Sequence, residues 1–272
     1  MITNSLDRKV KNARIGLALG GGGARGLTHL EILKVFDKLN IKPRIISGTS
    51  IGAIMGALYG CGYSGKDIED EFRKINLIDA GGLIDLTLLK RKGLIKGKKI
   101  EKYLKKKTGN AYFKNLKLPL KIVATEFWTG KQRVFTGGPV YKAVRASISI
   151  PGVFETVIID DEVLMDGGSV NPVPYDLISD ECDVGIAVDV LGDRSFEKDH
   201  GKKPNIINTI IGNYQIVQES LMENKLKVNP PDIYIKQALN DVGMLEFYKI
   251  DEILEEARKD AEKLEKILTD NF

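Results

Sequence analysis

The sequence is poor in the residues that support metal or redox chemistry. It contains only two cysteines and two histidines among its 272 residues. Cys61 and Cys182 stand far apart, so they form no disulfide framework, and no Cys/His cluster has the spacing of a metal site. We therefore predict a reduced, intracellular chain that needs no metal and no cofactor.

Long apolar runs are also absent. No stretch of eighteen apolar residues occurs, which argues against a conventional membrane-spanning helix. Residues 1–14 contain no apolar segment of the kind found in secretory signals. These absences predict a cytoplasmic protein, and any contact that it makes with a membrane is expected to be peripheral.

The net charge of +4 is modest, but the basic residues are unevenly placed. Residues 90–107 hold ten Lys or Arg and a single acid, Glu101. Two interpretations stay open, a solvated surface or a surface attracted to the headgroups of an anionic membrane. Nucleic acid is not expected as a partner, because only Tyr103 could stack on a base and no nucleic-acid-binding motif is present. Nothing in the sequence specifies an oligomeric state.

Segments with strand and helix periodicity alternate along the chain, which predicts the α/β class with a mainly parallel central sheet. We place a core at residues 15–179 and a C-terminal extension at residues 180–272. The extension is expected to complete the same globule with a strand, a long helix and an amphipathic terminal helix. The predicted strands are 15–19, 44–47, 120–127, 133–135, 163–165, 184–190 and 232–235. The predicted helices are 27–39, 51–60, 65–75, 100–107, 140–146, 206–225 and one from residue 250, with a mobile basic stretch at 81–99.

One serine stands in a pattern typical of a nucleophile. Gly48-Thr49-Ser50-Ile51-Gly52 is a G-x-S-x-G sequence between a predicted strand and a predicted helix. Glycines suit such a sharp turn, because side chains at their positions would clash with nearby backbone. The turn exposes the serine hydroxyl above a helix N-terminus, which favours developing negative charge. Ser50 is therefore the candidate nucleophile.

A second glycine motif follows the predicted strand 15–19. A dinucleotide fingerprint is satisfied by its glycine spacing, but residues 39–44 lack the acid expected about twenty residues further on. A Walker loop would require Gly-Lys-Ser/Thr, which is absent. We favour an oxyanion hole with amides near Gly22 and Gly23, since it explains the serine downstream. Arg25 either orients the loop, which we favour, or meets a substrate phosphate. The candidate oxyanion and substrate-binding residues are Gly21, Gly22, Gly23, Ala24, Arg25 and Gly26.

The nucleophile needs a base, and two candidates stay open on the residues alone. His200 would complete a triad in the order Ser50, Asp166, His200, but it stands in a charged segment without an apolar scaffold. Asp166 ends a predicted strand and precedes two glycines, so it could approach Ser50 and accept its proton directly. Asp166 could equally stabilise its own turn. His29, in the first turn after the glycine loop, suits a structural role.

Four motifs in this order resemble the patatin-like phospholipase family, in particular its bacterial members related to neuropathy target esterase. The motifs are Gly20-Gly21-Gly22-Gly23-Ala24-Arg25-Gly26, Gly48-Thr49-Ser50-Ile51-Gly52, Ala146-Ser147-Ile148-Ser149-Ile150-Pro151-Gly152-Val153-Phe154, and Asp166-Gly167-Gly168 with Asn171-Pro172-Val173-Pro174. The resemblance covers residues 15–179 and extends more weakly through residues 184–190 and 230–232. Where many members have Asp-Gly-Ala, this sequence has Asp-Gly-Gly.

The resemblance implies a three-layer α/β/α fold and a serine lipid acyl hydrolase of the phospholipase A, lysophospholipase or carboxylesterase type. It implies Ser50 as nucleophile, Asp166 as general base and the glycine loop as oxyanion hole. The substrate would be a lipid or another acyl ester. Two alternatives are an acyltransferase that uses an alcohol or carrier acceptor and a non-catalytic lipid-binding regulator. Nicotinamide-dependent redox chemistry, which depends on the glycine spacing alone, is a more distant one.

Overall fold

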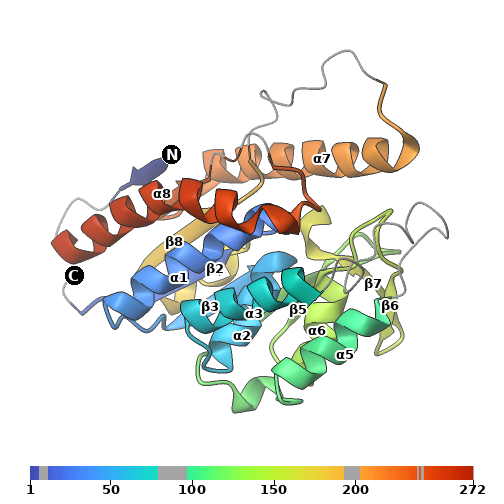
Figure 1. Ribbon diagram of the computed structural model, residues 1–272, viewed down its shortest axis with the longest axis horizontal. Helices are drawn as coiled ribbons and strands as arrows, with labels where there is room; N and C mark the ends of the chain where they lie inside the picture. The colour runs from blue at the N-terminus through green and yellow to red at the C-terminus, as the bar shows by residue number, and fades with distance from the viewer. Residues whose placement is uncertain (6–11, 79–96, 193–202, 238, 240–241, 272) are drawn as a thin grey trace.

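The computed structural model describes residues 1–5, 12–78, 97–192, 203–237, 239 and 242–271. A nine-stranded sheet in the order β1-β9-β8-β2-β3-β4-β7-β6, with β5 paired to β4, forms its middle layer (Figure 1). The strands are β1 (Ile2–Asn4), β2 (Ile15–Leu19), β3 (Ile45–Thr49), β4 (Leu120–Glu126), β5 (Gln132–Phe135), β6 (Val157–Ile159), β7 (Glu162–Asp166), β8 (Val184–Asp189) and β9 (Ile233–Lys236).

The centre of the sheet is parallel and its margins are antiparallel. β9, β8, β2, β3 and β4 run in one direction, whereas β1, β5, β6 and β7 pair antiparallel. The carboxyl ends of parallel strands meet at one edge, so β2 and β3 deliver the segments that follow them to the same edge. Thr49 pairs with Val123 of β4, and the next residue of β4, Ala124, pairs with Asp166. The register thus brings Ser50 and Asp166 to the same level of the sheet.

Helices cover both faces of the sheet, which confirms the predicted three-layer α/β/α class. Alternate residues of β2 and β3 show the two faces, because Leu17 and Ile46 join the larger core whereas Ala18 and Ile45 join the smaller one. The smaller core also contains Met222 of α7, and Figure 1 shows α7 along that side and α8 lying along α1. The α-helices are α1 (His29–Lys38), α2 (Ile51–Gly60), α3 (Gly65–Ile78), α5 (Lys98–Lys107), α6 (Val140–Ser147), α7 (Ile206–Val228) and α8 (Ile250–Asn271).

Most of the predicted elements are confirmed, with ends that shift by a few residues. The predicted helix 27–39 begins only at His29, because Gly23–Thr28 forms a 3-10 turn that continues the glycine loop. Two short strands at the margins, β1 and β6, were not predicted. The larger part of the predicted mobile stretch, residues 81–96, and the charged segment 193–202 lie outside the described residues.

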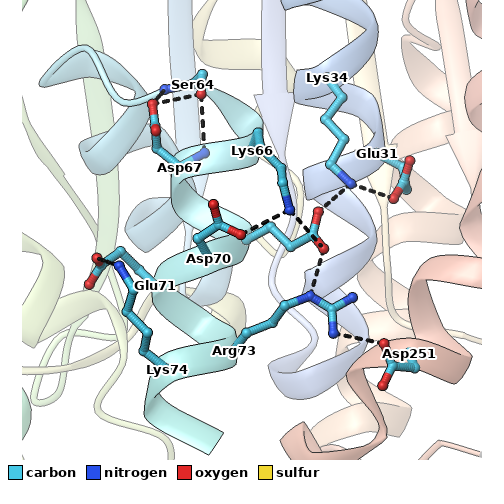
Figure 2. A network of polar contacts seen from close by, with 11 residues as sticks. Glu31, Lys34, Ser64, Lys66, Asp67, Asp70, Glu71, Arg73, Lys74 and Asp251 are labelled. Carbon is cyan, nitrogen blue, oxygen red and sulfur yellow. Dashed lines mark hydrogen bonds and ion pairs between the residues drawn. The ribbon is translucent and has the colours of Figure 1, made fainter. Parts of the chain in front are cut away.

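A network of ion pairs fastens α3 to α1 and α8 (Figure 2). Glu69 of α3 is its centre, because it accepts from Arg73 (2.6 Å) and pairs with Lys34 of α1 (2.5 Å). Arg73 continues to Asp251 at the start of α8 (2.7 Å). Burial would raise the pKa of Glu69, but the two cations outweigh it and lower that pKa to about 2. Three helices far apart in sequence are thus joined on one face of the sheet.

Two features of the described residues concern the predicted contact with a membrane, namely the character of the helices and the position of the lysines. None of the helices there combines the length and apolar character needed to cross a bilayer. α5 carries the described part of the basic stretch, and its exposed lysines are Lys98, Lys99, Lys102, Lys105 and Lys106.

Candidate active site

Ser50 occupies a strained turn between β3 and α2. Its φ of 54° and ψ of −121° lie in a region that few non-glycine residues adopt. The turn is tight because α2 packs directly on β2, and a Cβ at Gly52 would lie only 2.0 Å from the carbonyl oxygen of Leu19. The Ser50 amide donates to Oγ of Ser147 (2.8 Å), which ties the turn to the end of α6. This is the geometry of a nucleophile elbow.

Asp166, the last residue of β7, faces that serine. The Ser50 hydroxyl donates to Oδ2 of Asp166 over 2.6 Å. The Gly168 amide donates to the other oxygen, Oδ1 (2.8 Å), and the Asp166 amide donates to the Ser149 carbonyl (3.0 Å). The two residues that the family resemblance implies as nucleophile and base are therefore in direct contact, and the carboxylate also stabilises its own turn.

The pair is enclosed by protein. Ser50 is 5% exposed and Asp166 is fully buried. Burial disfavours the carboxylate and raises the pKa of Asp166 to about 6, although hydrogen bonds from Ser50, Gly168 and Tyr214 oppose this rise. A carboxylate with a pKa near 6 is a stronger base than an ordinary aspartate and is still mostly ionised at neutral pH.

The glycine loop after β2 crosses next to the serine, and Gly21 lies against its Cβ. Three of its amides are already engaged: Gly20 donates to the Val188 carbonyl (2.9 Å), Gly21 to the Pro172 carbonyl (2.9 Å) and Ala24 to the Met244 carbonyl (2.7 Å). The amides of Gly22 and Gly23 have no acceptor among the described residues. Gly23 has a φ of +61°, which glycine adopts at little cost. These two amides are thus the ones available to an incoming anion.

Arg25 and Gly26 hold the loop in place. The buried Arg25 guanidinium donates to the carbonyl of Val242 (2.7 Å) and to that of Leu191. Gly26 lies against Ile51, the residue that follows the nucleophile, and leaves no room for a Cβ. The geometry of Arg25 corresponds to the loop-orienting role rather than to a contact with a substrate phosphate.

No histidine of the described residues is hydrogen-bonded to Ser50. His29 is fully buried, and its Nε2 donates to the Gly20 carbonyl (2.9 Å). Burial lowers its pKa to about 4, so the ring is neutral and serves to anchor the glycine loop. His200 lies outside the described residues. Within them, no three Cys, His, Asp or Glu side chains group as a metal site would require.

α7 brings a residue to the site that the sequence analysis did not identify. The Tyr214 hydroxyl donates to Oδ1 of Asp166 (2.7 Å), and Tyr214 is only 7% exposed. Burial, and then the charge and hydrogen bond of Asp166, raise the pKa of Tyr214 well above 10. The available signal was a polar stripe, because Tyr214, Gln218 and Lys225 share one face of the helix at spacings of four and seven residues.

Comparison with known proteins identifies the family. The sequence model described as patatin-like phospholipase matches residues 17–178, which is more than half of the chain. The chain belongs to the patatin-like phospholipase family. The resemblance predicted from the four motifs is thereby confirmed.

Relatives and solved structures agree with this family. An uncharacterised NTE family protein of Mycobacterium tuberculosis is 32% identical over 196 residues, which are 69% of this chain and 52% of that protein. Lysophospholipase NTE1 of Kluyveromyces lactis is 27% identical over 278 residues, or 91% of this chain and 19% of that protein. The chain thus spans about half of the first relative and about a fifth of the second. The crystal structure of VipD from Legionella pneumophila shares the fold, with a TM-score of 0.54 at 12% identity over 95% of this chain and 67% of that one.

Proposed function

We propose that the protein is a lipid acyl hydrolase that uses Ser50 and Asp166 as a catalytic dyad. Membership of the patatin-like phospholipase family supports hydrolysis of lipid acyl esters in general. The name of the relative from Kluyveromyces lactis, a lysophospholipase, points to the same chemistry, although this chain covers only 19% of that protein. The substrate is proposed to be a glycerophospholipid or lysophospholipid.

The single observation that carries the dyad is the buried 2.6 Å contact between the Ser50 hydroxyl and Oδ2 of Asp166. In the proposed reaction, Oδ2 takes the proton as the serine oxygen attacks the ester carbonyl carbon. The amides of Gly22 and Gly23 stabilise the oxyanion of the tetrahedral intermediate. Asp166 then returns the proton to the departing alcohol, which leaves a fatty-acyl ester on Ser50.

The second half of the cycle uses the same groups. Asp166 removes a proton from a water molecule, which attacks the acyl-enzyme carbonyl while the glycine amides again stabilise the oxyanion. Collapse of this intermediate releases the fatty acid, and the proton returns to Ser50. Each proton transfer has a protein partner, so the cycle ends with the residues in their starting state.

The test compares the purified wild-type protein with Ser50→Ala and Asp166→Ala on a mixed panel of phospholipids and lysophospholipids, with products identified by mass spectrometry. We expect each variant to lose fatty-acid release by about 10³-fold or more, as removal of a nucleophile or its base generally does. Ser179→Ala, at an exposed serine remote from the dyad, is the matched control and should retain full activity. Circular dichroism of each variant verifies that the fold persists.

Other outcomes identify the alternatives. Near-normal turnover of Asp166→Ala together with an inactive His200→Ala would make His200, rather than Asp166, the base of Ser50. Acylated acceptor in place of free fatty acid, in the presence of a competing alcohol, would indicate acyl transfer. If a fluorophosphonate probe fails to label Ser50 and no lipid is consumed, the protein is a lipid-binding regulator rather than an enzyme.

A further inference from the structure

α7 turns a polar face toward the segment that carries the base. Tyr214 binds Asp166, the buried Gln218 lies next to Gly168, and Lys225 donates to the carbonyl of Val173 (2.7 Å). These three side chains stand on one stripe of the helix, so a single rigid element supports the chain from Asp166 onward. Only the first of them reaches a reacting group.

We propose that Tyr214 is a positioning residue that, with the Gly168 amide, holds Oδ1 of Asp166 so that Oδ2 faces the hydroxyl of Ser50. This inference rests on the proposed function for its catalytic meaning. Tyr214 itself lies outside the residues that match the family model, which end at residue 178.

The two carboxylate oxygens of Asp166 have different hydrogen-bond partners. Oδ1 accepts from Tyr214 (2.7 Å) and from Gly168 (2.8 Å), whereas Oδ2 accepts from Ser50 (2.6 Å). The terminal torsion of an aspartate is soft and roughly two-fold, so it requires fixed donors to hold one oxygen toward a partner. Because the Gly168 amide belongs to the same turn as Asp166, Tyr214 is the only donor among the described residues that fixes Oδ1 against a separate element.

The space around Gly168 supports this arrangement. A Cβ at that position would lie 2.0 Å from Nε2 of Gln218 and 2.5 Å from the Tyr214 hydroxyl. Any larger residue would therefore push the α7 side chains away from the turn. The second glycine of Asp166-Gly167-Gly168 and the tyrosine on α7 are thus matched to each other.

The hydrogen bond from Tyr214 also affects the pKa of Asp166. A hydroxyl that donates to a carboxylate stabilises the charged form more than the neutral form, so it lowers the pKa. For Asp166, burial raises the pKa to about 6, and the opposing groups are Ser50, Gly168 and Tyr214. No charged side chain of the described residues contributes to this shift. The Arg145 guanidinium of α6 donates to Ser149 Oγ (2.7 Å) and to the Glu155 carbonyl (3.0 Å).

The test measures turnover of a water-soluble short-chain p-nitrophenyl ester, and labelling of Ser50 by a fluorophosphonate, as functions of pH. In the wild-type protein both rates should rise with pH through a midpoint near 6, because Asp166 must be ionised to accept a proton. Tyr214→Phe should move this midpoint upward by about one pH unit, the shift expected when a hydrogen bond to a charged group is removed. Turnover should fall about fivefold at pH 6 and about tenfold well below it, and it should recover at high pH except for any loss caused by misorientation of the carboxylate.

Tyr59→Phe is the matched control. Tyr59 lies at the far end of α2, where its hydroxyl donates to Asp37 of α1 (2.8 Å), so this variant removes a partly buried Tyr–Asp hydrogen bond away from the dyad. Its midpoint should equal that of the wild type. Tyr214 would be a structural residue only if two results were found together. The midpoint of Tyr214→Phe would equal that of the wild type, and its turnover would fall no more than that of Tyr59→Phe.

A second readout does not require turnover. Titration of the ¹³C carboxyl resonance of Asp166 reports the pKa of that side chain directly, and Tyr214→Phe should raise it whether or not the ester assay detects activity. An unchanged resonance titration overturns the inference about Tyr214. Failure of the proposed function would be recognised separately. In that case Ser50→Ala would release as much fatty acid from the panel lipids as the wild type does.

Discussion

At the scale of single residues, Asp166 and Asp183 show how strongly the surroundings decide the chemistry of one side chain. Asp166 is fully buried, and burial is the largest cause that raises its pKa to about 6. Asp183 lies at the surface, where hydrogen bonds from Arg14 lower its pKa to about 2. Only the first environment makes a carboxylate that can exchange a proton with a substrate near neutral pH.

This contrast predicts opposite effects of two isosteric substitutions on stability. The raised pKa of Asp166 means that the folded state binds its proton more tightly than the unfolded chain does. The resulting stabilisation is complete below about pH 4 and is lost as pH rises through 6, with an upper limit of about 3 kcal/mol. Asparagine stays uncharged at every pH, so Asp166→Asn avoids burying a carboxylate. It should therefore raise the free energy of unfolding by about 1–3 kcal/mol at pH 8 and by less at pH 4.5. Urea denaturation at both pH values measures the difference.

Asp183→Asn is the control of opposite sign. Its lowered pKa contributes stability that is present above the unfolded pKa and disappears as pH falls through about 2. This variant should therefore be less stable than the wild type at pH 8. Destabilisation of both variants at pH 8 would contradict the prediction for Asp166.

At the scale of elements, the close contact between α2 and the sheet keeps Ser50 in its turn. Gly52→Ala would place a Cβ 2.0 Å from the Leu19 carbonyl oxygen, and backbone cannot yield as a side-chain end can. We expect a loss of about 2–4 kcal/mol in the free energy of unfolding, despite the better helix propensity of alanine. Gly60→Ala on the same helix meets its nearest atom only at 3.6 Å, so it should be neutral or stabilise by up to about 1 kcal/mol. Thermal denaturation of both variants tests the pair, and equal midpoints would contradict it.

Elements with a strong apolar period or a local motif were predictable from the sequence. The buried run at β2 and the G-x-S-x-G turn after β3 are both local signals, and both are found at the predicted residues. The closeness of Ser50 and Asp166, 116 residues apart, depends on the sheet register, which no local pattern contains. The contact between these two residues was predicted from the family resemblance and not from periodicity.

The role of α7 was not predicted, because its sequence lacks the usual apolar signal. Its inner face carries Tyr214, Gln215 and Gln218, whereas Ile206 and Ile216 are exposed. A helix that buries polar groups against polar partners has no apolar stripe to reveal its orientation. The strands β1 and β6 were also not predicted, and each has only three residues in which to show an alternating pattern.

At the scale of the whole molecule, the site is assembled from distant parts of the chain around one edge of the sheet. The glycine loop is held by carbonyls of Val188, Pro172 and Met244, and the base by a side chain of α7. Residues beyond position 179 therefore support groups within the matched family region. A truncation after that region would remove Tyr214 together with the backbone acceptor of the Ala24 amide.

The surface of α5 gives the last prediction, because the lipid substrate proposed above would be reached at a membrane. Its lysines Lys98, Lys102 and Lys106 are exposed and follow one another at one-turn spacing. Each lysine near an anionic bilayer contributes about 1 kcal/mol to binding at low salt. Reversing all three to Glu should weaken binding to vesicles that contain anionic phospholipid by about 100-fold or more, as measured by co-sedimentation.

The control applies the same change in net charge to another part of the molecule. Lys259, Lys263 and Lys266 are exposed on α8, which lies against α1, away from α5 (Figure 1). Because attraction to a surface is local and screened beyond roughly 10 Å at 0.1 M salt, their reversal should weaken vesicle binding far less. Equal losses in the two triple variants would mean that overall charge governs association, and the α5 surface would then have no special part in reaching the lipid.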